Sequence, residues 1–295
     1  MTDVPELVDP ILVVMLTGWI DASGSAAAAM AVAEQECDAA PLVSFDDDVY
    51  IDFRARRPTL ELRDGVNTRL AWSSPELQFG RSSSGQDVLF LSGPEPDMAW
   101  HRFAATIGEL AAGLNVRRMA ALGAYPFATP HTRPVQLSAT SPSKDVLAGL
   151  PFRTSSVDVP AGMAAALEQS LHDRGIPAIG VWAQVPHYVA TMSYPAASVA
   201  LLDGLATATG IAIGAGDLRR EAVLQRERLD QLIEGNEEHL AMVSQFERLY
   251  DAALESDGAP DEGQPGDGEL EMRSGDELAA EVERFLREQG PGKPG

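Results

Sequence analysis

The sequence is poor in cysteine and in long hydrophobic runs. A single cysteine, Cys37, excludes an internal disulfide framework and a cysteine-rich metal site. No apolar run approaches the roughly 18 residues that a membrane-spanning helix needs; the longest strand-like run is Ile11–Leu16. The N-terminus has no basic region ahead of an apolar stretch, so it does not have the pattern of a signal peptide. We therefore expect a soluble, cytoplasmic protein.

Positive charge and the familiar catalytic signatures are also scarce. The chain has 44 acidic against 22 basic residues, a formal net charge of −22. Nucleic acid and anionic membrane surfaces repel such a chain, which excludes both as partners. The patterns GxxxxGK[ST], HExxH and GxSxG are absent, and the five histidines are too scattered to form a metal cluster by spacing. We expect no cofactor and no metal.

What the sequence does contain is an alternation of strand and helix patterns. The 295 residues, 45% of them hydrophobic, can bury a sizeable core. Strands separated by helices of 10 to 15 residues indicate βαβ units, an α/β fold and a mostly parallel sheet covered on both faces. The patterns predict strands near 11–16, 42–45, 59–63, 66–72, 88–91, 119–122, 135–139 and 178–183, and helices near 25–35, 100–114, 163–175 and 195–210.

The composition changes along the chain and predicts four segments. Residues 1–215 form the α/β core domain, and residues 216–254 form a charged helical hairpin interrupted at Gly235-Asn236. Residues 255–273 are rich in glycine, proline and acid, which predicts a disordered acidic linker. Residues 274–295 contain a short amphipathic helix that starts with a capping box, followed by a tail.

Polar residues follow four of the predicted strands. In an open α/β sheet, ligands bind in the crevice beyond the carboxyl ends of the strands. Two imidazoles, two carboxylates and a guanidinium gathered there could perform acid–base chemistry or bind a small anion. The same groups could instead fix turns through hydrogen bonds or line a subunit interface. The candidate ligand or interface crevice comprises Gly18, Trp19, Asp21, Glu95, His131, Arg133, His187 and Tyr188.

A second cluster combines one acid with three arginines. Asp52, Arg54, Arg56 and Arg57 lie within six residues of a chain that is otherwise poor in positive charge. Guanidinium groups so close together could receive a carboxylate or phosphate. We interpret them instead as ion-pair partners for acidic residues of the same chain or of a neighbouring subunit.

Five segments together resemble the proteasome assembly chaperone 2 family, in its actinobacterial branch. No single motif is specific, but the five occur in the family's order, and the resemblance covers roughly residues 8–250. The segments are Gly18–Ala22, Asp52–Pro58, Gly93–Pro96, Pro130–Pro134 and Trp182–Tyr188.

The resemblance carries expectations about fold and function. It implies a three-layer α/β/α sandwich similar to nucleoside phosphorylases and peptidyl-tRNA-hydrolase-like enzymes, and a homotrimer that works without ATP or metal. No catalytic residues are established for the family, which favours a non-enzymatic chaperone or interaction protein with proteasome subunits or another protein as client. The alternative is an enzyme or small-anion-binding protein that uses the crevice.

The C-terminus departs from some relatives. Those that dock on proteasome rings end in a hydrophobic residue, a tyrosine and any residue, whereas this chain ends Gly292-Lys293-Pro294-Gly295. The sequence therefore gives no support for direct insertion into the pockets between proteasome subunits.

Overall fold

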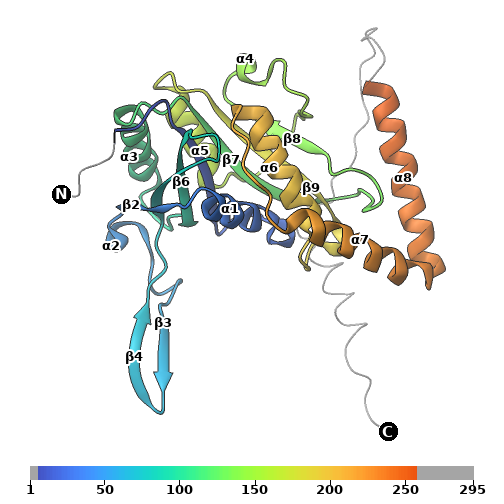
Figure 1. Ribbon diagram of the computed structural model, residues 1–295, viewed down its shortest axis with the longest axis horizontal. Coiled ribbons are helices and arrows are strands. Elements are labelled where there is room, and N and C mark those ends of the chain that lie inside the picture. Colours follow the sequence, from blue (N-terminus) through green and yellow to red (C-terminus); the bar gives the residue numbers. More distant parts are fainter. Residues whose placement is uncertain (1–5, 258–295) are drawn as a thin grey trace. The chain divides into compact units, whose positions relative to one another are not determined.

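Strand β1 (Ile11–Thr17) lies at the centre of a seven-stranded sheet in the computed structural model, which describes residues 6–257. The strand order is β2-β5-β6-β1-β7-β9-β8 (Figure 1). The other six strands are β2 (Ala40–Ser44), β5 (Glu76–Arg81), β6 (Asp87–Pro94), β7 (Arg118–Phe127), β8 (Leu137–Thr140) and β9 (Ala178–Pro186).

The sheet is mixed but mostly parallel, as predicted. β1 pairs in parallel with β6 and β7, and β7 pairs in parallel with β9. β5 and β8 run against their neighbours. Strand β5 is missing from the sequence prediction because its alternation is short and contains a glycine. A Cβ at Gly80 would lie 2.5 Å from the carbonyl oxygen of Cys37, so this edge of the sheet needs a residue without a side chain.

Helices cover both faces of the sheet. Short α-helices are α2 (Asp47–Tyr50) and α4 (Lys144–Leu147), and the 3₁₀ turns are η1 (Ala22–Gly24) and η2 (His187–Val189). The longer helices are α1 (Ser25–Glu36), α3 (Trp100–Gly113), α5 (Met163–His172), α6 (Pro195–Thr209), α7 (Leu218–Glu234) and α8 (Glu237–Asp257).

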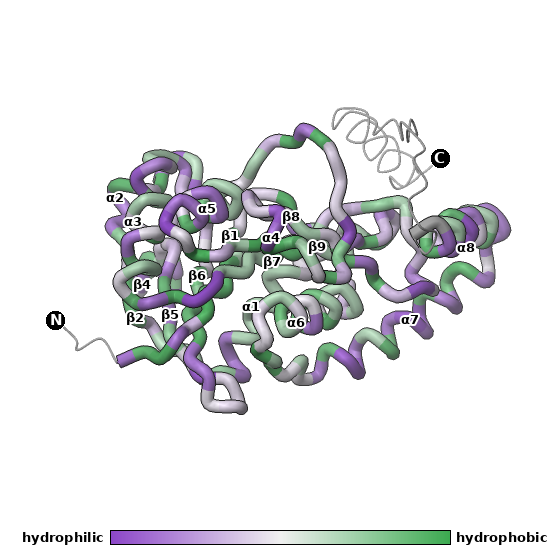
Figure 2. The backbone as a smooth tube through the Cα atoms, turned by 90° about the horizontal axis from the view of Figure 1, so that it is seen from above, coloured by the Kyte–Doolittle hydropathy of each residue, from purple (hydrophilic) through white to green (hydrophobic). Residues whose placement is uncertain are grey.

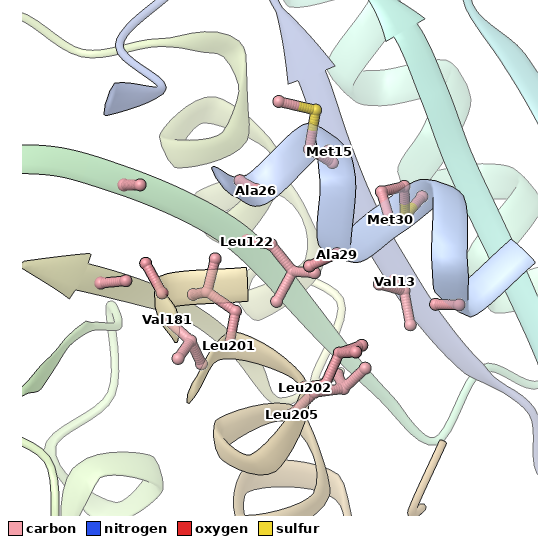
Figure 3. Packing of buried hydrophobic residues seen from close by; sticks show 14 of the residues in the cluster. Val13, Met15, Ala26, Ala29, Met30, Leu122, Val181, Leu201, Leu202 and Leu205 are labelled. Carbon is pink, nitrogen blue, oxygen red and sulfur yellow. The ribbon is translucent and has the colours of Figure 1, made fainter. Parts of the chain in front are cut away.

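The alternation of β1 explains the three layers. Ile11, Val13 and Met15 join one buried cluster in the layer of α1 and α6; Figure 3 shows Val13 and Met15 there. Leu12 and Val14 point to the opposite layer, which contains α3 and α5. All five side chains are at most 5% exposed, because successive side chains of a strand face opposite sides of the sheet. The predicted α/β/α architecture is confirmed.

A second, two-stranded sheet consists of β3 (Thr59–Arg63) and β4 (Val66–Ala71). Asp64 and Gly65 connect the strands, with positive φ angles of 51° and 80°, as the predicted two-residue turn requires. Figure 1 shows this hairpin extending away from the main sheet.

Helices α7 and α8 follow the core as the two C-terminal helices that the sequence predicts. The break falls at Gly235 and Asn236, where the Asn236 side-chain oxygen accepts the backbone N–H groups of Glu238 and His239 at the start of α8. Hydrophilic residues recur along both helices (Figure 2), yet Leu218 and Leu229 are buried in the cluster that contains α6. Helix α7 therefore belongs to the core through a narrow apolar stripe. Residues 258–295, with most of the predicted linker and the terminal helix, lie outside the described residues.

Candidate functional site

The two carboxylates of the predicted crevice hold the first turns of two helices. Asp21 accepts the backbone N–H groups of Ala26 and Ala27 at 2.8 and 3.0 Å, at the start of α1. Burial raises the pKa of Asp21, against the opposing effect of these hydrogen bonds. Glu95 accepts the N–H of Met163, the first residue of α5, at 3.0 Å. Helix N-termini leave N–H groups unpaired, and carboxylates satisfy them.

Gly18 and Trp19, which follow β1, lie beside other segments of the chain. A Cβ on Gly18, whose φ is +122°, would lie 2.7 Å from Arg56 Nη2 and 3.0 Å from Glu95 Cγ. The Gly18 backbone therefore approaches both side chains closely. Trp19 is 45% exposed, and its ring lies against Gly162, just before α5.

His131 is the centre of a hydrogen-bonded chain with Tyr188 and Asp230. The Tyr188 oxygen accepts the backbone N–H of His131 at 2.8 Å and lies 2.7 Å from His131 Nδ1. The Tyr188 hydroxyl therefore donates its proton to Nδ1, which leaves Nε2–H to donate to Asp230 at 3.1 Å. Burial lowers the pKa of His131, consistent with this neutral form.

Arg133 binds two acidic residues of α8. Its Nε and Nη2 atoms donate to both carboxylate oxygens of Asp251, at 2.9 and 2.8 Å, and Nη1 donates to Glu247 at 3.0 Å. Thr132 also donates to Glu247, at 2.5 Å. The hydrogen bond from Arg133 lowers the pKa of Asp251 and raises that of the guanidinium.

Aromatic rings complete this contact. The His187 ring meets Phe246 of α8 edge-on, with centroids 5.4 Å apart, and Tyr188 stacks on Phe246 at 6.4 Å with an interplanar angle of 5°. The residues that join the loops after β7 and β9 to α7 and α8 are called here the helix clamp: His131, Arg133, His187, Tyr188, Asp230, Phe246, Glu247 and Asp251.

The eight predicted crevice residues thus fall into two groups by their contacts. Four lie at the ends of β1 and β6, where Asp21 and Glu95 bind the starts of α1 and α5, and four belong to the helix clamp. Sequence reasoning missed Asp230, Glu247 and Asp251, because acidic residues on a charged helix have the pattern of a solvated face. Their only signal in the sequence is that the helices bearing them also carry an apolar stripe.

The predicted arginine cluster is only partly paired. Arg56 donates to Asp97 at 2.8 Å, and the carboxylate of Asp52 accepts the backbone N–H of Arg54 at 2.9 Å. The side chains of Arg54 and Arg57 are exposed and form no ion pair with any of the described residues.

Glu168 of α5 is a buried acid that the sequence pattern did not single out. It is 4% exposed and accepts a hydrogen bond from Thr140 at 3.1 Å. Thr140 in turn accepts the indole N–H of Trp182 at 3.3 Å. Burial raises the pKa of Glu168 to about 7.

The hollows recorded among residues 6–257 include two that lie away from these residues. One, of about 420 Å³, lies at the amino ends of β7 and β9, where Arg117 and Arg118 donate to the last carbonyls of α6. The other, of about 450 Å³, lies between α1 and the start of α7. Within residues 6–257, no three His, Cys, Asp or Glu side chains group in a way that could hold a metal ion. Nor does that part of the chain contain a helix of the length and apolarity needed to cross a membrane.

Comparison with known proteins shows which family this fold and these contacts represent. The chain belongs to the PAC2 family, whose model matches residues 15–233. The comparison with curated proteins finds no match.

Solved structures of relatives agree with this assignment. A Corynebacterium glutamicum protein of unknown function is 30% identical, with a TM-score of 0.80; the match covers 87% of this chain and 97% of that one. A Mycobacterium tuberculosis proteasome-assembly chaperone homologue is also 30% identical, with a TM-score of 0.73 and coverage of 80% and 99%. A Pyrococcus furiosus archaeal proteasome activator, 16% identical with a TM-score of 0.59 and coverage of 77% and 95%, shares the fold.

Proposed function

We propose that this chain is a non-enzymatic, chaperone-like protein that binds other proteins, with proteasome subunits as its first candidate clients. One observation carries the proposal: the ionisable groups at the carboxyl edge of the sheet bind the chain's own helices, whereas large apolar side chains elsewhere are exposed. A protein that acts through its surface needs the second feature and has no use for free catalytic groups.

The contacts of the crevice residues support protein binding over the small-anion alternative. An anion site would need Arg133 to be free, but its guanidinium binds Asp251 and Glu247. The Tyr188–His131–Asp230 chain has the order of an acid–base relay. However, burial raises the pKa of Tyr188 to about 12, which disfavours the phenolate that a nucleophile would require.

The family assignment supports the choice of client. The M. tuberculosis relative is described as a proteasome-assembly chaperone homologue, and we infer that this chain acts in the same kind of process. We further propose that it works as a homo-oligomer, with a trimer as the form that the family resemblance implies, in the cytoplasm.

Pull-down from the native host tests the proposal. The full chain is tagged and its partners are scored for proteasome α- and β-subunits, and binding is repeated with purified subunits. We expect capture of unassembled subunits and faster assembly of the 20S particle. Phosphate binding measured by calorimetry, abolished by Arg133→Ala, would instead support the anion-binding function, and absence of proteasome subunits in both experiments would refute the proposed client.

A further inference from the structure

The β3–β4 hairpin has an apolar face that residues 6–257 leave largely uncovered. Leu60 and Leu62 alternate onto one face of β3, and Leu70 is the cross-strand partner of Leu60. These three side chains are 45%, 53% and 45% exposed. Glu61 alternates to the other face, where it pairs with Arg63 and Arg69. An isolated two-stranded hairpin is marginally stable in water, so an uncovered apolar face favours a binding partner.

The segment that contains the hairpin is also rich in positive charge. Residues 52–72 contain five arginines against three acidic residues, in a chain whose net charge is −22. Arg54 and Arg57 are exposed and unpaired within the described residues. The partner surface that fits is therefore apolar and acidic.

The corner between α7 and α8 has this character. Leu232 and Leu240 are 68% and 41% exposed, and the exposed acids Glu234, Glu237 and Glu238 lie between them in the sequence. No lysine or arginine occurs from residue 229 to residue 247. We call these five residues the acidic corner.

The hairpin cannot reach the acidic corner of its own chain. It is inserted between β2 and β5 at one edge of the sheet, whereas α7 and α8 are clamped to the loops that follow β7 and β9. Figures 1 and 2 place the two at opposite ends of the sheet. A second copy of the chain carries such an acidic, apolar surface, and it is present at the same concentration as the hairpin.

We propose that the β3–β4 hairpin of one copy docks on the acidic corner of the next. Leu60, Leu62 and Leu70 then lie against Leu232 and Leu240, and Arg54 and Arg57 face the three glutamates. Such a contact joins two different surfaces, so it is head-to-tail, and it closes into a ring when the rotation between copies allows. The inference deepens the proposed function, because it assigns the surfaces that form the oligomer.

Self-association of the full chain tests the docking, measured by sedimentation and light scattering over a range of concentrations. We expect the wild type to form oligomers, and Leu60→Ser with Leu62→Ser to raise the dissociation constant roughly tenfold or more. Val157→Ser with Val159→Ser is the matched control, because these valines are 50% and 60% exposed outside the hairpin. A monomeric wild type, or a hairpin variant that associates like the control, would overturn the inference.

Reversing the charges on the two surfaces tests whether they pair with each other, and it changes no residue of the strands β3 and β4. Arg54→Glu with Arg57→Glu, and separately Glu237→Arg with Glu238→Arg, should each weaken association at low salt, and the chain carrying all four changes should recover it. If the chain with all four changes does not recover association, the two surfaces do not contact each other. Capture of proteasome subunits is measured on the same variants. A wild type that forms oligomers but captures no subunit leaves the docking intact and removes the proposed client.

Discussion

The α7–α8 helices and the β3–β4 hairpin both lie outside the main sheet, but their surfaces are used differently. The helices bury Leu229, Ile233 and Val243, each at most 8% exposed, and their acidic residues pair with His131 and Arg133 of the core. The β-hairpin leaves its leucines half exposed. The comparison teaches that paired polar groups here indicate internal structure, whereas uncovered apolar groups indicate a partner. Changes in the helix clamp should therefore alter the stability of the protein, whereas changes in the β-hairpin should alter its self-association.

The largest effect is expected from removing the buried histidine of the clamp. His131→Ala leaves the Tyr188 hydroxyl without an acceptor and creates a cavity, which should lower the free energy of unfolding by about 2–4 kcal/mol. Urea unfolding measures it. The matched control is His101→Ala, since His101 is exposed on α3. An equal loss in both variants would show that the clamp contributes nothing specific.

Glu168→Gln should stabilise the protein above neutral pH. The folded-state pKa of about 7 exceeds the usual 4.5, so the folded state keeps its proton while the unfolded state loses it. Stability from this group is complete below pH 4.5 and is lost as the pH rises to 7, by up to about 3 kcal/mol. Unfolding at pH 5 and pH 8 measures the difference, with Glu109→Gln as the exposed control on α3. A wild type equally stable at both values would contradict the assignment.

Arg133→Ala should cost less than the loss of His131, because its partners are partly exposed. Side chains of Arg133, Glu247 and Asp251 are 32%, 27% and 49% exposed, and water weakens such pairs. We expect a measurable loss of stability that is smaller than that of His131→Ala, because the contact with Asp251 is bidentate but partly exposed to water. Hydrogen exchange should rise in α8 and remain unchanged in α3. Arg228→Ala, an exposed position on α7, is the control and should leave exchange as in the wild type.

Mild acid should weaken the helix clamp, which becomes measurable when Glu168 is replaced by Gln so that this group no longer titrates. Because burial lowers the pKa of His131 below 6.5, its contribution is complete above pH 6.5 and declines as the pH falls. In the Glu168→Gln background, stability should therefore decrease from pH 7 to pH 5. Adding His131→Phe should flatten that slope, and an unchanged slope would show that another group is responsible.

The smallest effect on stability is expected in the β-hairpin. Leu60→Ser should change the free energy of unfolding of the monomer by less than about 0.5 kcal/mol, because the side chain is already exposed. Leu77→Ser on β5, where the leucine is 3% exposed, should cost several times more. Leu60→Ser should weaken association although it leaves the folded monomer stable. The reverse pattern would contradict the comparison between the α7–α8 helices and the β-hairpin.

Local signals in the sequence predicted most of the elements correctly. The Asp64-Gly65 turn and the break at Gly235-Asn236 depend on neighbouring residues, and both are confirmed. Strand β5 was missed because its alternation is short and contains Gly80, whose close approach to Cys37 no local pattern shows. The sequence also placed the eight crevice residues at strand ends without showing what each one contacts.

The sequence by itself determined the layers of this protein, because the alternation of β1 and the helical stripes specify which side chains must be buried. Tertiary structure alone decided the use of the polar residues. Asp230 lies 99 residues from His131, and Asp251 lies 118 residues from Arg133. A charge on a helix has the same pattern whether it faces water or a partner. Only the folding of α7 and α8 against the loops of the sheet determines which charges are paired.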